Sequence, residues 1–184
     1  MSDGRLAMGY EASIHPADPT SFDARVRATV PSALRLATVV LGTRDGADDV
    51  VQIAMERAWS AFERYDPDRP FRPWFLRIVA NTARNDRRQR GRRAALRVRA
   101  EHQRRDVQAS AEDDVLIVLD RTRVLAALNH LDVDDRTVIA LRYFEQLAEA
   151  EMAEVLDCAP GTVKSRLSRA RLRLRQHLEE VEDG

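Results

Sequence analysis

The stretch from Leu147 to Arg175 carries hydrogen-bond donors at a spacing suited to reading DNA. Its first part has the pattern of a short helix that ends near Asp157. Pro160 suits the first turn of a second helix, because N–H groups there have no acceptor within the helix and proline has no N–H. In that second helix apolar residues recur at i, i+4, i+7 and i+11, so one face is predicted to be buried. Two helices joined by a short turn, the second of them basic, are the form of a major-groove reader. The side chains off the apolar face are all donors: Thr162, Lys164, Ser165, Arg166 and Arg169.

A second polar stripe occurs earlier in the chain, in a helix predicted over 74–90. Its members stand at i, i+4, i+7, i+8 and i+11, and two of them are amides. The preceding loop, 66–73, contains three prolines, which stiffen the backbone and prevent a regular helix there. A stiff loop followed by a polar, basic helix face can position side chains against a ligand. The residues of the stripe are Arg77, Asn81, Arg84, Asn85 and Arg88.

The charge distribution is consistent with nucleic-acid binding although the formal net charge is zero. Basic residues gather between Arg84 and Arg105, and no acidic residue occurs from Pro160 to His177. Attraction to phosphate is local over a Debye length of about 8 Å, so two basic elements suffice. The single cysteine, Cys158, excludes an internal disulfide framework, has no neighbours for a metal site, and is predicted to pack as a small apolar side chain.

The predicted fold class is all-α, with two small helical domains joined by a flexible linker. We expect a flexible leader over 1–19, a first domain over 20–90, a linker over 91–113 that is either partly helical or disordered, and a second domain over 114–180. Helices are predicted over 20–41 with a kink or restart at Pro31, and over 47–65, 74–90, 114–129 and 134–144, followed by the two of the opening stretch. Trp59 and Trp74 are predicted to pack in the core, Trp74 with the alternative of a nucleic-acid contact. No apolar run approaches the roughly 20 residues of a membrane span, and the first residues lack a signal-peptide core.

Short sequence patterns in both halves resemble one family. In the first half they are Asp48-Asp-Val-Val-Gln52, Ala58-Trp59 and Phe71-Arg-Pro-Trp74, followed by Leu76-Arg-Ile-Val-Ala-Asn81. In the second half they are Asp134-Asp-Arg-Thr-Val138, Leu141-Arg-Tyr-Phe144, Glu151-Met-Ala-Glu154 and Gly161-Thr-Val-Lys-Ser-Arg166. In this order they resemble an extracytoplasmic-function (ECF) sigma factor, from the smallest class of the sigma-70 family of bacterial RNA polymerase subunits. The chain departs from the family at Ile53, where an acidic residue is common, and at Asp157, where glycine is common.

The resemblance implies a role for three surfaces. An acidic helix face would bind the clamp helices of the polymerase: Asp48, Asp49, Gln52 and Glu56. The proline-rich loop and the helix after it would bind the minus-ten element as single strand, with Arg84 and Arg88 on phosphates: Phe71, Arg72, Trp74, Arg77, Asn81, Arg84, Asn85 and Arg88. The basic second helix would read the minus-thirty-five element as duplex through Thr162, Lys164, Ser165, Arg166 and Arg169, while Arg171, Arg173 and Arg175 contact phosphate or solvent.

The implied function is that of a promoter-specificity subunit and not an enzyme. Its partners would be core RNA polymerase, promoter DNA and an anti-sigma factor, with no cofactor, no metal, no small-molecule substrate and no membrane insertion, and it would act in the cytoplasm. Two alternatives stay open. A conventional helix-turn-helix regulator would bind duplex operators alone, and a helical scaffold or RNA-binding protein would hold phosphate without sequence preference. Only a sigma factor gives core polymerase new start sites.

Overall fold

The computed structural model describes residues 19–100 and 124–182, and these form helices joined by short turns, with no strand among them. The predicted all-α class is confirmed. The leader predicted over 1–19 lies outside the described residues except for Pro19, where the first helix begins, and so does the part of the predicted linker from residue 101 onward. No helix in the described part of the chain is long and apolar enough to cross a membrane.

The first half consists of α1 (Pro19–Leu41), α2 (Ala47–Ala61), a 3-10 turn η1 (Phe62–Arg64) and α3 (Phe71–Ala100). Helix α1 continues through Pro31 without the predicted restart. Helix α3 begins at Phe71 and not at residue 74, because Pro73 falls in its first turn, where a helix needs no N–H donor. It also extends to Ala100, so residues 91–100 of the expected linker are helical. Arginine and alanine, which are good helix formers, dominate this extension.

The second half begins, within the described residues, with a helix over 124–130. It continues with α5 (Val133–Ile139), the π-helical turn η2 (Ala140–Phe144), α6 (Glu149–Leu156) and α7 (Pro160–Glu182). Asp132 caps α5, because its carboxylate accepts the backbone N–H groups of Asp134 and Asp135 at 3.0 and 2.8 Å. Pro160 opens α7, and the predicted apolar face of that helix is buried along Val163, Leu167 and Ala170.

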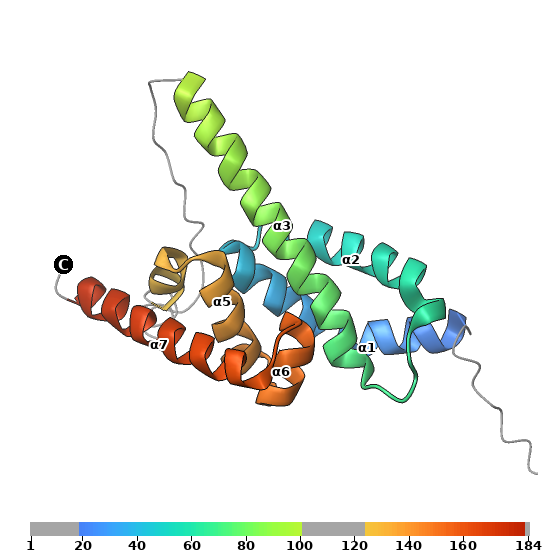
Figure 1. Ribbon diagram of the computed structural model, residues 1–184. Helices are drawn as coiled ribbons and strands as arrows, with labels where there is room; N and C mark the ends of the chain where they lie inside the picture. The colour runs from blue at the N-terminus through green and yellow to red at the C-terminus, as the bar shows by residue number, and fades with distance from the viewer. Residues whose placement is uncertain (1–18, 101–123, 183–184) are drawn as a thin grey trace, which may run out of the picture.

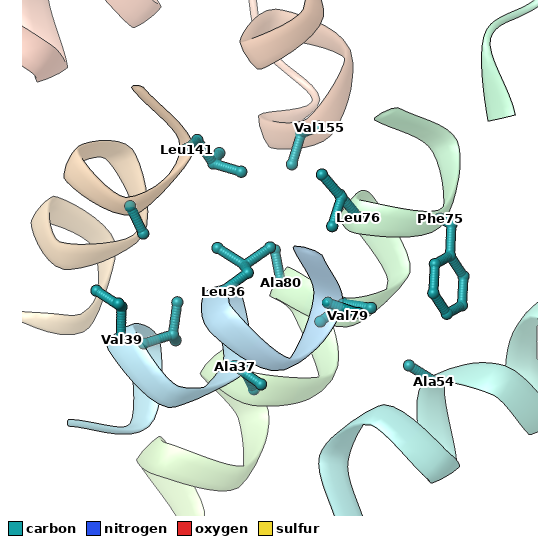
Figure 2. Packing of buried hydrophobic residues seen from close by; sticks show 14 of the residues in the cluster. Leu36, Ala37, Val39, Ala54, Phe75, Leu76, Val79, Ala80, Leu141 and Val155 are labelled. Atoms are coloured by element: carbon teal, nitrogen blue, oxygen red, sulfur yellow. The ribbon is translucent and has the colours of Figure 1, made fainter. Parts of the chain in front are cut away.

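The two halves share one hydrophobic core. Helix α3 packs against α1 and α2 of the first half and against α5 and α6 of the second, and its C-terminal part projects beyond the other helices (Figure 1). Figure 2 shows the junction, where Leu141 and Val155 of the second half face Leu36 of α1 and Leu76 of α3. All four of these side chains are buried, so the halves pack as a single unit in this structure.

A buried arginine fastens the end of α1 to the second half. The Arg136 guanidinium, 1% exposed, donates to the carbonyls of Val40 at 3.4 Å, Asn129 at 2.9 Å and Leu131 at 3.1 Å. These carbonyls lie at or just after helix ends, where helical partners are missing. Burial, together with the positive charge of nearby Arg87, lowers the pKa of Arg136 to about 10, and Asp132 opposes the change. Within the described residues Arg136 Nε has no hydrogen-bond partner.

Gly42 lies directly beneath that contact. Its φ of +75° is in the left-handed region, and it ends α1. The Asn129 amide donates to the Gly42 carbonyl at 3.3 Å. A Cβ built on Gly42 would lie 2.0 Å from Asn129 Oδ1 and 2.4 Å from an Arg136 nitrogen. Glycine at this position therefore allows both the turn and the close approach of the second half.

Candidate nucleic-acid interfaces

The predicted helix-turn-helix is formed by α6 and α7. Helix α6 buries Met152 and Leu156, as its spacing predicts, and ends at Asp157. Asp157 has a φ of 52°, so the left-handed turn that the family commonly makes with glycine is made here by a residue that tolerates the conformation. The next residue, Cys158, is partly buried against the core, which confirms its predicted packing role.

The outer face of α7 is available to a ligand. Lys164, Ser165 and Arg169 are exposed, while Thr162 and Arg166 are half-buried. The Ser165 hydroxyl donates to the Thr162 carbonyl at 3.0 Å, and Arg169 Nε donates to the Ser165 carbonyl at 3.4 Å. None of these five forms an ion pair with another described residue, so their cationic groups face solvent near the N-terminal half of the helix.

Arg173 differs from the expectation that it contacts phosphate or solvent. Its guanidinium pairs with the carboxylates of Asp132, at 3.2 Å, and Asp135. The hydrogen bond to Asp135, assisted by the charges of both acids, raises the pKa of Arg173. The sequence interpretation failed here because Arg173 and its partners lie on different helices. Arg173 connects α7 to α5 and thereby helps to fix the angle of the recognition helix.

The amides predicted to bind the minus-ten strand lie on an exposed face of α3. Asn81 and Asn85 are one turn apart and both are exposed. Trp74 is partly buried and packs against the core, with its ring centroid 5.3 Å from that of Phe71. Phe71 is 8% exposed and belongs to a cluster of rings that includes Phe62. The Phe71 ring is therefore too buried to contact a base in this arrangement.

The arginines predicted beside those amides are paired with acids of the second half. Arg77 contacts Asp157 at 3.0 Å, in the turn between α6 and α7. Arg84 contacts Asp134 at 2.7 Å, and Arg88 contacts the same carboxylate at 3.0 Å. Each arginine is thus placed at the junction of the two halves and not on an open DNA-binding channel.

Arg72 takes part in the most buried of these contacts. Its guanidinium donates to the Glu145 carboxylate at 2.8 Å and to the Glu145 carbonyl at 2.8 Å. Arg35 of α1 donates to the same carboxylate at 3.2 Å, and the Glu145 side chain is completely buried. Asp134, Glu145 and Asp157 were missed as partners because no local pattern marks an acid that pairs across a fold.

The acidic face of α2 is solvent-exposed along its length. All four side chains of this face are exposed: Asp48, Asp49, Gln52 and Glu56. Exposure is expected both for a face that binds a partner and for a face that only contacts water. Ile53 and Trp59 lie on the same helix and are 41% and 49% exposed, so the prediction that Trp59 belongs to the core was wrong. Trp59 contacts only the edge of the core, with its ring 5.1 Å from Phe22. Two large apolar side chains therefore accompany the carboxylates.

Metal chemistry finds no support in the described residues, since no group of three or more histidine, cysteine or acidic side chains comes together there. The described histidines His130 and His177 have ring centroids 5.3 Å apart, but they belong to no such group in this part of the chain. The chemistry that the described surfaces offer is ionic and hydrogen-bonding: cations and amides on α3 and α7, and carboxylates on α2.

Comparisons with known proteins identify both halves. The Sigma-70 region 2 family matches residues 25–93, and the Sigma-70, region 4 family matches residues 121–174. The ECF RNA polymerase sigma factor SigL of Mycobacterium tuberculosis is 35% identical over 148 residues, which are 80% of this chain and 82% of that protein. The RNA polymerase sigma-H factor of Pseudomonas aeruginosa is 31% identical over 167 residues, 84% of each chain.

Solved structures agree with this assignment. The sigma factor RpoE from Bartonella quintana, in complex with the anti-sigma factor NepR, superposes with a TM-score of 0.71 at 27% identity, over 87% of this chain and 98% of that one. CnrH in complex with the cytosolic domain of CnrY gives a TM-score of 0.66 at 29% identity, over 90% and 93%. With a region 2 in its first half, a region 4 in its second and relatives that match over most of their length, the chain belongs to the ECF RNA polymerase sigma factors.

Proposed function

We propose that the two regions of this sigma factor divide promoter recognition between three surfaces. The acidic face of α2 binds core RNA polymerase, the exposed amides of α3 hold the opened minus-ten strand, and the outer face of α7 reads the minus-thirty-five duplex. The proposed domain limits are those expected from the sequence, with region 2 over 20–90 and region 4 over 114–180. The protein supplies binding energy and strand capture in the cytoplasm, where polymerase and promoter meet, and nucleotide addition belongs to the polymerase.

One observation carries the proposal for duplex reading. The apolar side of α7 packs against the core, with Val163 and Ala170 at 0% exposure, while Lys164 and Arg169 on the other side are exposed. Lys164, Arg166 and Arg169 lie in the first half of α7, where recognition helices contact base edges. Arginine and lysine pair with O6 and N7 of guanine, and Thr162 and Ser165 add hydroxyl groups that suit several bases.

For the minus-ten element the exposed amides of α3 are the main candidates. A base that has left the stack presents its Watson–Crick edge, which an amide can read with one donor and one acceptor. Asn81 and Asn85, one turn apart, can read neighbouring bases. Arg77, Arg84 and Arg88 lie on the same stripe and can hold the phosphates of the single strand, and Arg72 and Trp74 lie at its N-terminal end.

Substitution of Asn81 tests this assignment. Asn81→Ala should reduce initiation about 5- to 100-fold in run-off transcription with core polymerase, since one base-reading pair contributes about 1–3 kcal/mol. Its affinity for core polymerase should be unchanged. Gln176→Ala removes an exposed amide from α7 and serves as the matched control. Equal activity of the two variants, on a promoter that needs strand opening, contradicts the role of Asn81.

The α2 surface offers both charge and apolar area to the polymerase. Asp49, Ile53 and Glu56 follow at i, i+4 and i+7, so carboxylates flank an exposed apolar side chain, with Asp48 and Gln52 beside them. Interfaces of this kind combine an apolar centre with a charged rim. Charge reversal at Asp49 should weaken association with core polymerase, and the loss should shrink as salt rises. An unchanged dissociation constant for core polymerase would remove α2 from the interface.

We also propose control by an anti-sigma factor that docks in an apolar groove between the regions. The solved RpoE is in complex with the anti-sigma factor NepR, and the solved CnrH is in complex with the cytosolic domain of CnrY. In this chain the groove is lined by Leu34 and Val39 of α1, Val124 and Leu125 of the helix over 124–130, and Phe144. Its walls come from both regions, so an amphipathic helix lying in it would hold both together.

The groove can be tested through Leu125, which is 43% exposed. Leu125→Glu should leave purified run-off transcription unchanged and raise the output of the dependent promoters in cells, because only the inhibitor is displaced. Leu172 is an exposed leucine of α7 that does not line the groove, so Leu172→Glu serves as the control. This change should not raise the output of the dependent promoters in cells. Unchanged output in cells from Leu125→Glu would place the inhibitor elsewhere.

A further inference from the structure

The loop between η1 and α3 contains a compact turn on the surface. All of its residues, 66–70, are exposed. Pro67 stands at the second position of a β-turn, which the Arg69 N–H closes by donating to the Asp66 carbonyl at 3.1 Å. The Asp66 carboxylate also accepts the Asp68 N–H at 3.1 Å. The proline at the end of the loop restricts the backbone of the residue before it, so the turn is stiff within itself.

A buried tyrosine attaches this turn to the core. The Tyr65 ring is 5% exposed and stacks on Phe62, with ring centroids 5.7 Å apart. The rings of Phe71 and Trp74, in the first turn of α3, lie 5.7 and 4.8 Å from it. The Tyr65 hydroxyl donates to the carbonyl of Arg69, near the far end of the turn. The ring therefore packs in the core while the hydroxyl reaches the loop.

The hydroxyl remains a donor at neutral pH. Burial raises the pKa of Tyr65, the positive charge of Arg25 opposes this change, and Asp66 adds to it. The phenol therefore stays protonated, and its proton is available to the Arg69 carbonyl. Ring packing and donation can be separated in this side chain, because phenylalanine has the same ring without the hydroxyl.

The turn leads directly into the end of α3 that carries Arg72 and Trp74. A single strand has no fixed shape, so a base that has left the stack is held best by groups that are already in place. A turn that moved relative to α3 would have to be ordered each time a strand bound, and this ordering would weaken binding. The bond from Tyr65 to Arg69 removes that freedom before DNA arrives.

We propose that the Tyr65 hydroxyl is a positioning group for minus-ten recognition, which holds the turn 66–70 where its backbone and Arg69 contact a base of the opened strand. Tyr65 itself does not contact DNA. Phe71 and Asn81 are about 15 Å apart along α3, so the turn and the amides serve different bases of the element. The inference rests on the proposed strand-binding function of α3 and adds the residue that fixes the preceding loop.

The test removes the hydroxyl and keeps the ring. Tyr65→Phe is compared with Tyr143→Phe, a change at a tyrosine that is 52% exposed and whose hydroxyl makes no hydrogen bond with another described residue. The Tyr143 ring lies 5.6 Å from the Arg171 guanidinium, and phenylalanine preserves this contact. Circular dichroism establishes that both variants keep the helices and the melting temperature of the wild type.

Amide hydrogen exchange, followed by NMR, measures the turn in the free protein. The N–H groups of Asp68 and Arg69 are hydrogen-bonded within the turn. Their exchange should be about 2- to 10-fold faster in Tyr65→Phe, the factor that one neutral hydrogen bond accounts for. Tyr143→Phe should exchange these two groups at the wild-type rate. Unchanged exchange in Tyr65→Phe would mean that the hydroxyl does not fix the turn, and the proposal would fail.

Sequence selection measures the consequence for DNA. Core polymerase bound to each variant is mixed with a pool of single strands that is randomised over the minus-ten element, and the bound strands are sequenced. Tyr65→Phe should reduce the base preference at one position, or at two adjacent positions, by about 2- to 10-fold. Asn81→Ala should reduce the preference at a different position. Tyr143→Phe should select the same sequences as the wild type.

Three results of the selection would refute the role of Tyr65. Unchanged preferences with unchanged binding mean that the hydroxyl has no part in recognition. Weaker binding with unchanged preferences is the result of a merely structural role, because a smaller active fraction lowers the binding of all sequences alike. A loss confined to the position that Asn81→Ala relaxes means that Tyr65 acts through α3 and not through the turn.

Failure of the proposed function would appear differently. If the wild type selects no sequence from the pool, the strand-binding function of α3 is refuted, and the role of Tyr65 in recognition is refuted with it. The difference in amide exchange at Asp68 and Arg69 would stand in that case, because it depends only on contacts within the chain.

Discussion

The contact of Glu145 with Arg35 and Arg72 allows a quantitative prediction. Three hydrogen bonds from the two guanidinium groups reach the carboxylate, at 2.8, 3.2 and 3.3 Å. Hydrogen bonds to charged groups contribute about 1.5–3 kcal/mol when they are buried. Both arginines are partly exposed, so solvent screening reduces the contribution to about 1 kcal/mol for each arginine.

We therefore expect Arg35→Ala and Arg72→Ala together to lower the free energy of unfolding by about 2–3 kcal/mol, since a buried carboxylate is left without cationic partners. In a Glu145→Gln background the same pair of changes should cost about 1 kcal/mol or less, because a neutral amide needs no counter-charge. The coupling energy of the cycle is thus about 1–2 kcal/mol.

Urea titration of the four chains measures this coupling. Far-UV circular dichroism follows all helices, whereas tryptophan fluorescence follows only the first half, where Trp59 and Trp74 lie. Coincident transitions of the two probes establish two-state unfolding. A coupling below about 0.5 kcal/mol, with coincident transitions, would refute the reasoning, because it would mean that Glu145 is stabilised by something other than the two arginines.

Three further predictions concern single residues. Gly42→Ala should lower the melting temperature more than Gly46→Ala. In both variants alanine must adopt a left-handed backbone conformation, which costs about 1–2 kcal/mol, but a Cβ on Gly46 meets only the flexible end of an arginine side chain. Equal shifts in melting temperature would contradict the close approach of the second half at Gly42. Arg166→Ala should reduce discrimination between matched and mutated minus-thirty-five duplexes about 5- to 100-fold in gel shifts, and a uniform loss on both duplexes would argue against base reading. Arg173→Ala should instead lower the melting temperature with selectivity retained, because Asp135 loses its partner, and loss of selectivity without loss of stability would return Arg173 to the DNA surface.

The helix faces could be predicted from the sequence because they depend on local periodicity. Val163, Leu167 and Ala170 recur at helical spacing, and all three are buried. The start of α7 at Pro160 could be predicted because the fixed φ and missing N–H of proline suit the first turn of a helix. The exposed positions of Asn81 and Asn85 follow from the same reasoning, since the neighbouring apolar stripe had to face the core.

Long-range charge pairing could not be predicted in this way. Arg84 and Asp134 are 50 residues apart, and Arg35 and Glu145 are 110 apart. An acidic residue in a helix pattern gives the same signal whether it meets water or an arginine of another helix. The prediction that Trp59 is buried was wrong because it rested on residue type alone. Large aromatic residues are usually buried, but Trp59 lies at the edge of the core beside the acidic face of α2.

Helix ends were predicted less well than helix faces. The three prolines of 66–73 indicated a loop up to Pro73, but proline is also tolerated in the first turn of a helix, and α3 begins at Phe71. This shift places Phe71 in the aromatic cluster. At the other end, Gly91 was taken as the start of a linker, whereas α3 continues through it to Ala100.

The central claim is that this chain gives RNA polymerase a new promoter specificity by reading two elements with two regions. Mapping the 5′ ends of transcripts made by core polymerase on genomic DNA, with and without the chain, tests it most directly. The account predicts new start sites that share one upstream duplex element and one element near position minus ten, and loss of these starts with Asn81→Ala and Arg166→Ala. Start sites identical to those of core polymerase alone, from a chain that still binds DNA, would contradict it.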